Sequence, residues 1–556
     1  MQMNMEFAPV VLAYRFTEAK HKLINQVPEE WKRHIMSADQ KEQDEEWENL
    51  HEIYSPKVLK AIKDLKGFYC KFGQVLAGRN DTVPDAYVER LRTLEDAVPP
   101  EPPHIIRKVV TESLGITDID EVFSEWDDTP LGSASIGQVH KAKLKSTGEV
   151  VAVKVQYPGV ERLFRTDIKT SRKFCQIFAP EQVIIFDEIE RQFATEFDYR
   201  GEANNLDEIR QNMERFRDIA QVPEPVMDLC TKDVLVMTYL PGKKLYDCVK
   251  EYGEVVAAKQ GKTFKQLEKE GIEKVKREGF PPKYDGPGPT QIALYQQSLR
   301  LRDAAVNAPR HLYNVLIGSW SGRTWELSHS VIPPNTALIM QRLLQVMGHQ
   351  ILVDGCFNGD PHGGNVLLMP DGRLGLIDYG QVKRLTRDER LHIARIYRGL
   401  LAQDKAGLRE LAMSRGYKSR SFDSEVIYKM TQFALDTDGP SVMGNRNIQQ
   451  FMDDMYSRDP WSATDAGVIM PSRATFMIRG IGLMLGHPVS MLDHWGKLAE
   501  SVLQEEEEKA QGQKEEKTQR QKEEQSGHER AAQLADGKGQ LSLAIRRATD
   551  GKSATM

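Results

Sequence analysis

The stretch Asn358-Gly359-Asp360-Pro361-His362-Gly363-Gly364-Asn365, followed by Leu376-Ile377-Asp378-Tyr379-Gly380, decides the fold. Its glycines and proline keep the first segment from becoming helix, so Asp360 and Asn365 are expected in one loop. Residues 366–368 are typical of a short strand, Asp371-Gly372 of a hairpin turn, and residues 374–377 of the returning strand. Asp378 is thereby expected at a strand end that faces the same loop.

Two carboxylates and an amide that converge across a hairpin suit phosphoryl transfer. Asp360 can orient or deprotonate a nucleophile, while Asn365 and Asp378 supply hard oxygen ligands for Mg²⁺. A D-x-x-x-x-N spacing is common by chance, and the hydrophobic hairpin and Asp-Tyr-Gly that follow it make the pattern more specific. We expect His362 to serve as a hydrogen-bonding residue of the loop, with a role as base as the alternative.

The composition describes a globular protein with several folded parts. The chain has 556 residues, 40% of them hydrophobic and 28% charged, which indicates two or three domains with extensions. Its net charge of −6 argues against a general nucleic-acid binder, so no nucleic-acid partner is expected. The five cysteines are scattered without a C-x-x-C pair, which argues against a zinc site or a disulfide framework.

The chain offers no obvious membrane or export signal. It contains no run of about 18 apolar residues, so no membrane span is expected. Its first residues lack the compact apolar segment of a secretory signal, and they include acids, which organellar transit peptides avoid.

Residues 58–76 carry apolar side chains at helical spacing. Lys71 and Gln74 are three positions apart and therefore share a face. Gly73 between them costs about 1 kcal/mol relative to Ala in a helix, which suggests a close backbone approach. The alternative is a solvated lysine on an ordinary amphipathic helix.

A loop of small residues lies between two strands of the next region. The loop contains Gly132-Ser133-Ala134-Ser135, and residues 145–148 turn the chain into Val150-Val151-Ala152-Val153-Lys154-Val155. Such a loop can lay backbone N–H groups over phosphates, and Lys154 on the returning strand would reach them. Taken alone, the second strand could equally be an ordinary strand of alternating residues whose lysine faces water.

Residues 182–218 are expected to form one long helix with three notable acids. Asp198 and Glu202 are four positions apart and share a face, whereas Glu196 points elsewhere at about 100° per residue. One face could pair with Lys154 while the other meets the helix of Lys71. A solvated acidic face is the alternative.

The rest of the chain divides into a hinge, an insertion and a helical region. Residues 226–227 and 234–239 are expected as strands before Leu240-Pro241-Gly242 breaks the sheet, and about 252–335 form an inserted segment, partly helical. Arg479 lies among apolar residues, and three interpretations stay open for its helix: ordinary core packing, a buried ion pair of Arg479, or an interfacial helix. We expect these parts: N-terminal helical extension (1–55), helical cap (56–103), N-lobe (104–240), hinge and insertion (241–337), C-lobe (338–500) and a charged tail (501–556), disordered or a single solvated helix.

The order of these motifs resembles the two-lobed protein-kinase-like fold, an α+β architecture. The Lys71-Phe72-Gly73-Gln74 segment is similar to the K-x-G-Q signature of the UbiB-type atypical kinase-like family. That family also carries counterparts of four further segments, and the resemblance extends over about Val58 to Leu485, apart from the insertion. The four segments are Ser135 to His140, Glu196-Phe197-Asp198, Asp354-Gly355-Cys356-Phe357 and Asp360 to Asn365.

The resemblance implies an ATP- and Mg²⁺-dependent kinase or ATPase. By this resemblance, Lys154 pairs with Glu202 and binds phosphates. Asn365 and Asp378 hold Mg²⁺, and Asp360 is the catalytic acid. The small-residue loop contacts the nucleotide. A cap of Lys71 and Gln74, near Glu196 and Asp198, restricts large substrates.

The resemblance also implies partners and a compartment. The family is associated with ubiquinone and other isoprenoid lipids, which makes a lipid or quinone-precursor substrate, peripheral membrane association and a mitochondrial or plastid location the expectation, with a cytoplasmic location as the alternative. Two other functions stay open: a low-turnover nucleotide-binding scaffold and a small-molecule phosphotransferase. The chain departs from the family at Gly132 and Ser133, where alanines are usual, at Asn358-Gly359, where His-Ala is usual, and at Tyr379, where Phe is usual.

Overall fold

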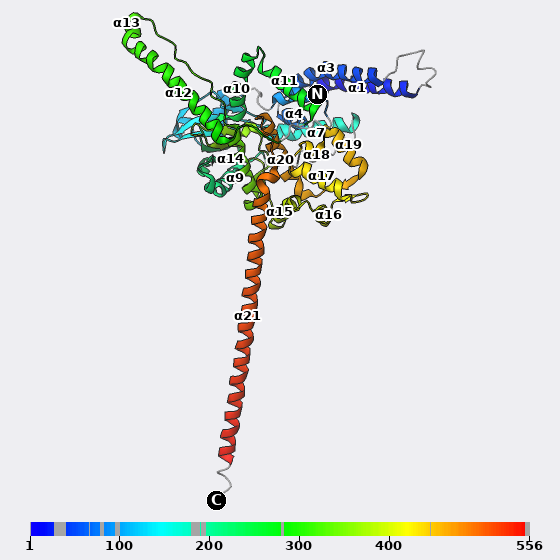
Figure 1. Cartoon of the computed structure of the whole chain (residues 1–556), viewed down its shortest axis with the longest axis vertical. Coiled ribbons are helices and arrows are strands. Elements are labelled where there is room, and N and C mark those ends of the chain that lie inside the picture. The colour runs from blue at the N-terminus through cyan, green and yellow to red at the C-terminus, as the bar shows by residue number, and fades with distance from the viewer. Residues whose placement is uncertain are drawn as a thin grey trace.

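The computed structural model describes residues 2–26, 40–65, 67–77, 83–94, 100–178, 190, 196–279, 283–444 and 446–550. Two lobes and an N-terminal helical layer form the body, from which two helical segments project in different directions (Figure 1). The structure confirms the predicted α+β, two-lobed, kinase-like architecture. None of the described helices is long and apolar enough to cross a membrane.

The N-lobe is built on an antiparallel sheet in the order β1 (Phe123–Trp126), β3 (Gly137–Leu144), β4 (Val150–Gln156), β6 (Val234–Thr238), with β2 (Gly132–Ser133) paired to β3. Successive side chains of a strand point to opposite faces. The odd-numbered valines of β4 are therefore buried together with Ile106 and Val110 of α6 (Pro103–Leu114). Lys154 points away from α6 and lines the cleft between the lobes.

The prediction of a single long helix over residues 182–218 is wrong. Helix α9 (Tyr199–Asn212) begins only after Asp198, whose extended backbone and side-chain acceptance of the Arg200 amide make it an N-cap. Glu196 lies in the turn before α9, and residues 179–189 and 191–195 lie outside the described part. The strand expected at residues 226–227 is also wrong at Met227, which begins a 3₁₀ turn, Met227–Leu229.

The C-lobe combines short strands with a group of helices. Strands β9 (Val366–Leu368) and β10 (Leu374–Leu376) form the predicted hairpin, flanked by β7 (Lys243–Lys244) and, in parallel, by β5 (Ala220–Gln221). Strand β8 (Cys356–Asn358) pairs with β11 (Val382–Arg384). The helices are α14 (Thr336–His349), α15 (Arg387–Leu401), α16 (Lys405–Ser414), α17 (Ser424–Leu435), α18 (Pro440–Met443), α19 (Ile448–Arg458) and α20 (Ala466–Met484). A two-stranded ribbon of β12 (Lys418–Ser419) and β13 (Trp461–Ala463) lies among them.

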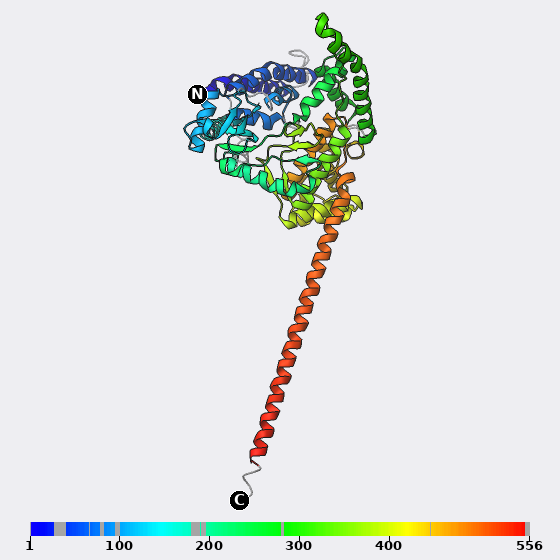
Figure 2. The same cartoon turned by 90° about the vertical axis from the view of Figure 1, so that its left-hand side faces the viewer.

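The N-terminal helices α1 (Gln2–Gln26), α3 (Gln40–Leu65), α4 (Gly67–Ala77) and α5 (Asp85–Leu91) pack together on the body (Figure 2). Gly73 of α4 is a site of close approach, as predicted. A Cβ there would lie 2.5 Å from Leu94 Cδ1 and 3.3 Å from Leu91 Cδ2. A larger residue at position 73 would have to displace the ends of these two leucine side chains.

The segment expected as an insertion contains part of α10 (Leu245–Lys259), all of α11 (Phe264–Glu278) and α12 (Pro289–Tyr313). The C-terminal helix α21 (Met491–Asp550) starts in the C-lobe core, where the Trp495 indole donates to Leu344 O, and then leaves the body as one long helix (Figures 1 and 2). The charged tail is therefore part of helix α21 as far as Asp550.

Asp459 holds the loop between α16 and α17. Its carboxylate accepts hydrogen bonds from Ser419 Oγ (2.6 Å) and from the amides of Ser421 (2.8 Å) and Asp423 (2.9 Å). Burial opposes the charge on this group, but the three hydrogen bonds outweigh burial and lower the pKa of Asp459 to about 2.

We expect Asp459→Asn to lower the free energy of unfolding by about 2 kcal/mol at neutral pH, because hydrogen bonds to a charged acceptor are lost. A depressed pKa stabilises the fold above the unfolded-state value, so the difference from wild type should vanish as the pH falls from about 5 to 2. Urea unfolding across this range measures it, with the exposed Asp453→Asn on α19 as the control. A pH-independent difference would contradict the prediction.

Candidate functional site

A buried ion pair of the N-lobe lies at the cleft, where a carboxylate of the C-lobe approaches it. Lys154 Nζ lies 2.8 Å from both carboxylate oxygens of Glu202 and 3.8 Å from Asp378 Oδ1. The side chains of Lys154 and Glu202 are 15% and 6% exposed. The strand, α9 and the end of the C-lobe hairpin therefore meet at one ammonium group.

The electrostatics of this group keep the lysine charged. Burial disfavours the ammonium, but the carboxylates of Asp378 and Glu202 outweigh burial and raise the pKa of Lys154. Burial raises the pKa of Glu202 to about 6, against the opposing attraction of Lys154. Lys154 is thus protonated at neutral pH, and a phosphate entering the cleft meets an ammonium group whose position Glu202 fixes.

The loop after β8 is fastened to the end of the hairpin by Asn358. The Asn358 side chain accepts from the Asp360 amide (2.8 Å) and donates to the Asp378 carbonyl (3.0 Å). His362 Nδ1 accepts from the Gly364 amide at 3.1 Å, a hydrogen-bonding role within the loop. One buried side chain thereby sets the separation of Asp360 and Asp378, a role that sequence reasoning did not assign to Asn358.

Asp378 has a strained backbone and an accessible side chain. Its φ of 66° is in the left-handed region, which non-glycine residues avoid, and its side chain is 47% exposed. Asn205 of α9 donates to the next carbonyl, that of Tyr379, at 3.0 Å. These contacts hold the strained residue with its carboxylate at the cleft.

Asn365 and Asp378 supply an amide oxygen and a carboxylate, which are ligand types that Mg²⁺ takes in proteins. The Asn365 nitrogen donates to the Asp360 carbonyl at 3.5 Å, so its oxygen is the end suited to a cation. Among the described residues no group of three or more His, Cys, Asp or Glu could hold a metal. Mg²⁺ in nucleotide sites needs only one or two protein carboxylate or carbonyl ligands together with substrate phosphates.

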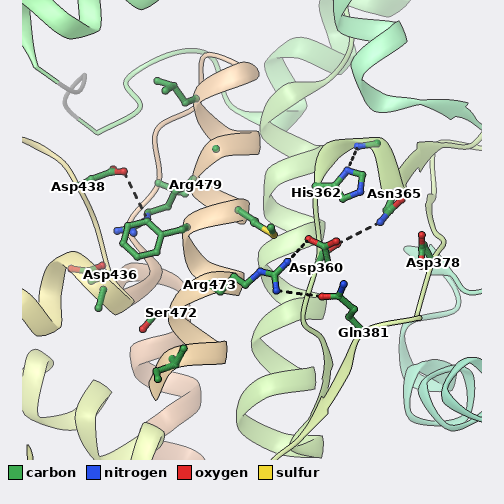
Figure 3. A pocket seen from close by; sticks show the side chains of 18 of the residues that line it. Asp360, His362, Asn365, Asp378, Gln381, Asp436, Asp438, Ser472, Arg473 and Arg479 are labelled. Carbon is green, nitrogen blue, oxygen red and sulfur yellow. Dashed lines mark hydrogen bonds and ion pairs between the residues drawn. The ribbon is translucent and has the colours of Figure 1, made fainter. Parts of the chain in front are cut away.

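Asp360 is held by a chain of polar contacts that crosses the cleft (Figure 3). Arg473 of α20 donates to Asp360 Oδ1 and to Gln381 Oε1, both at 3.3 Å, and Gln381 donates to Glu196 at 2.7 Å. Sequence reasoning missed Arg473 and Gln381. Gln381 directly follows the Asp-Tyr-Gly segment, which was an available signal, but Arg473 lies far along the chain in a helix with no motif.

The small-residue loop lines the cleft but uses part of its backbone internally. All four residues Gly132 to Ser135 lie along the cleft. The Ala134 amide donates to Gly137 O (2.8 Å), and Ser133 Oγ lies 2.5 Å from the Tyr157 hydroxyl. Only the remaining N–H groups of the loop are therefore suited to a phosphate.

The structure describes the side chains of only two of the four residues in the predicted cap, Glu196 and Asp198. Lys71 and Gln74 lie on α4, and their side chains are outside the described part of the structure. Glu196 contacts Gln381 at the cleft. Asp198 does not share a face with Glu202 as predicted, because its carboxylate caps α9 and pairs with Arg200 at 2.6 Å.

The cleft extends beyond the nucleotide-sized region. Its volume is about 2090 Å³, and single-ligand pockets usually measure about 300–1,000 Å³. The additional space lies among α15 to α20 and is lined mainly by apolar side chains, including Ile396, Leu408, Ile427, Met430, Phe476 and Leu483. Arg479, which is buried, points into this part, on a different side of α20 from Arg473 (Figure 3).

The family model of the ABC1 atypical kinase-like domain matches residues 93–282 and 330–412. The chain carries an ABC1 atypical kinase-like domain. The two matched blocks contain Lys154, Glu202, Asp360, Asn365 and Asp378, so the site described above lies within the family's domain.

Relatives of the chain include proteins named as kinases. The probable protein kinase UbiB of Pseudomonas aeruginosa is 35% identical over 38% of this chain and 40% of its own length. The chloroplastic protein ACTIVITY OF BC1 COMPLEX KINASE 1 of Arabidopsis thaliana is 27% identical over 58% of this chain and 37% of its own length. An uncharacterized Synechocystis protein is 26% identical over 75% of this chain, and 58% of that protein is covered. The chain thus spans less than two thirds of the length of these relatives.

A solved structure from Mycobacterium tuberculosis, a complex with erythromycin, matches with a TM-score of 0.44 and 23% identity, covering 80% of this chain and 95% of that one.

We expect Asn358→Ala to loosen the end of the hairpin, because its two hydrogen bonds join Asp360 to Asp378. The loss should be about 1–3 kcal/mol of stability, with faster amide exchange over residues 378–380. Hydrogen–deuterium exchange measures this, and Asn447→Ala, which removes an N-cap of α19, is the control. Equal exchange at residues 378–380 in all three proteins would refute the role of Asn358.

Proposed function

We propose that this chain is a Mg²⁺- and ATP-dependent atypical kinase or ATPase of the UbiB type, acting in isoprenoid-quinone or lipid metabolism. The observation that carries the proposal is the meeting of Lys154, Glu202 and Asp378 around one buried ammonium group. Protein kinases use the same set of groups to hold nucleotide phosphates and their metal ion. The matched kinase-like domain supports this reading, since the relatives include a probable kinase.

In the proposed reaction each side chain has one task. Lys154 attracts the phosphates, and Glu202 fixes the position of Lys154. Asn365 and Asp378 would hold Mg²⁺, which neutralises phosphate charge when bound. Asp360, with one oxygen held by Arg473, presents its other oxygen to the hydroxyl or water that attacks the terminal phosphate.

The apolar part of the cleft supports a small apolar second substrate. Its volume exceeds the needs of a nucleotide, and the helical layer that contains Lys71 and Gln74 would restrict a folded protein. Arg479 adds a polar group, since its Nε and Nη2 have no hydrogen-bond partner among the described residues and Nε lies 4.0 Å from Asp438 Oδ2. A plastid or mitochondrial location belongs to this proposal, with the chloroplastic relative as support and a cytoplasmic location as the alternative.

One observation favours a second function, a low-turnover nucleotide-binding scaffold. Arg473 contacts one of the two carboxylate oxygens of Asp360, and a neighbouring cation weakens a carboxylate as a proton acceptor. A scaffold would bind nucleotide and change conformation without significant turnover. A free-standing small-molecule phosphotransferase is disfavoured by the K-x-G-Q segment.

We expect MgATP to stabilise the wild type by roughly 2.7 kcal/mol at 100 times its Kd, and we expect Asp378→Ala to abolish the shift. Differential scanning fluorimetry with ATP or ADP, with and without Mg²⁺, measures it. Asp371→Ala, in the exposed turn of the same hairpin, should retain the shift. An unchanged Mg²⁺-dependent shift in Asp378→Ala would remove the metal role from Asp378.

We expect Asp360→Asn to lower the ATPase rate by about 10²–10⁴-fold with little change in nucleotide binding, because the amide cannot accept the proton of the nucleophile. Steady-state phosphate release measures the rate, and the thermal shift measures binding. A wild-type rate no higher than that of Asp360→Asn would establish the scaffold function instead.

A further inference from the structure

A helical hairpin within the insertion projects from the body. Helix α12 continues through a π-helical turn (Asn314–Gly318) into α13 (Ser319–Ser321), after which Gly322 reverses the chain and residues 323–335 return to the body (Figures 1 and 2). The family model matches the chain up to residue 282 and again from residue 330, so the insertion predicted over about 252–335 is wrong before residue 283 and covers 283–329. The hairpin is therefore an addition to the family's domain and has no place in the phosphoryl-transfer site.

The polar face of α12 is used inside the hairpin. Asn307 donates to Ser328 O and accepts from the Ser328 amide, both at 2.7 Å. Asn314, two helical turns further on, makes the same pair of bonds to Trp325, at 2.9 and 2.7 Å. Asp303 accepts from the amide and hydroxyl of Ser330. These hydrogen bonds hold the returning segment along the helix, so the hairpin has a defined structure.

The apolar face of the same helix is turned outward. At about 100° per residue, Leu294, Leu301, Leu312 and Leu316 lie within a sector of about 60°, opposite Asn307 and Asn314. All four leucines are exposed, Leu312 by 61%. Surface helices of globular proteins normally turn their polar face to water. The reversed arrangement indicates that the outer face of this hairpin meets something other than water.

The end of the hairpin is the most apolar part. Val315 is 70% exposed and Trp320 is 89% exposed, with Leu316 and Ile317 exposed between them. Arg310 and Arg323 flank this group, and no acidic residue occurs from 304 to 325, although the whole chain has a net charge of −6. A tryptophan and aliphatic side chains beside arginines are the combination that binds at a membrane interface.

We propose that this hairpin tip inserts into the surface of an anionic lipid bilayer and attaches the protein to it. The tip is the projecting end of one helix and its returning chain (Figures 1 and 2), whereas a stable protein interface needs about 800 Å² per partner. The basic flank matches anionic lipid headgroups, and the apolar side chains match the boundary of the acyl layer. The proposal does not depend on nucleotide chemistry, so it stands or falls separately from the proposed function.

Flotation of the full chain with lipid vesicles tests this. The vesicles are phosphatidylcholine alone or phosphatidylcholine with about one third phosphatidylglycerol. We expect the wild type to float with the anionic vesicles, less so at high salt, and the double variant Leu316→Ser, Trp320→Ser to bind about tenfold more weakly or worse. We expect Arg323→Ser to weaken binding to the anionic vesicles and to reduce its salt dependence.

The control is Leu163→Ser, which removes an exposed leucine from α7 (Val160–Phe178) in the N-lobe and should leave flotation unchanged. Unaltered thermal unfolding of all variants excludes misfolding. Flotation of the double variant equal to wild type, or no flotation of the wild type with either vesicle, would overturn the proposal. So would self-association of the wild type without lipid that the double variant lacks, which would make the tip a contact between copies of this chain.

Discussion

The buried contact of Lys154 with Glu202 is the interaction on which the rest of the site depends. Removing either partner leaves a charge in a site with little access to water, which costs far more than a surface ion pair. The period-2 alternation of β4 turns Lys154 toward the cleft, and the N-cap at Asp198 places Glu202 in the first turn of α9. Asp378 then approaches the same ammonium from the C-lobe, so one charge aligns three distant segments.

The C-lobe positions its groups with two further devices. Asn358 joins the loop of Asp360 to the strained backbone of Asp378, which turns two loops into one unit. Helix α20 separates the two parts of the cleft, with Arg473 toward Asp360 and Arg479 toward Asp436 and Asp438 (Figure 3). The two arginines are six residues apart, about 9 Å along the helix and about 240° around it. A ligand in the apolar part would thus lie against the helix that holds Asp360.

Sequence reasoning succeeded where short-range physics decides the structure. Alternating apolar residues and the Asp371-Gly372 turn led to the hairpins of both lobes, and tight packing explains the glycine beside Lys71. It failed at Asp198, because a carboxylate that caps a helix and one that lies within it look alike in a periodic pattern. Arg473 and Gln381 were missed because their contact with Asp360 joins segments far apart in the chain.

The sequence by itself determined the family resemblance, the order of the motifs and the strands that carry them, since these follow from residue types at fixed spacing. Only the tertiary structure decided which arginine holds Asp360, which side chain joins Asp360 to Asp378, and which face of α12 is turned outward. Local patterns fix how a segment folds, but they leave open which of its faces is buried. That choice depends on the partner that packs against the segment, and for α12 the partner is its own returning chain, which takes the polar face and leaves the leucines outside.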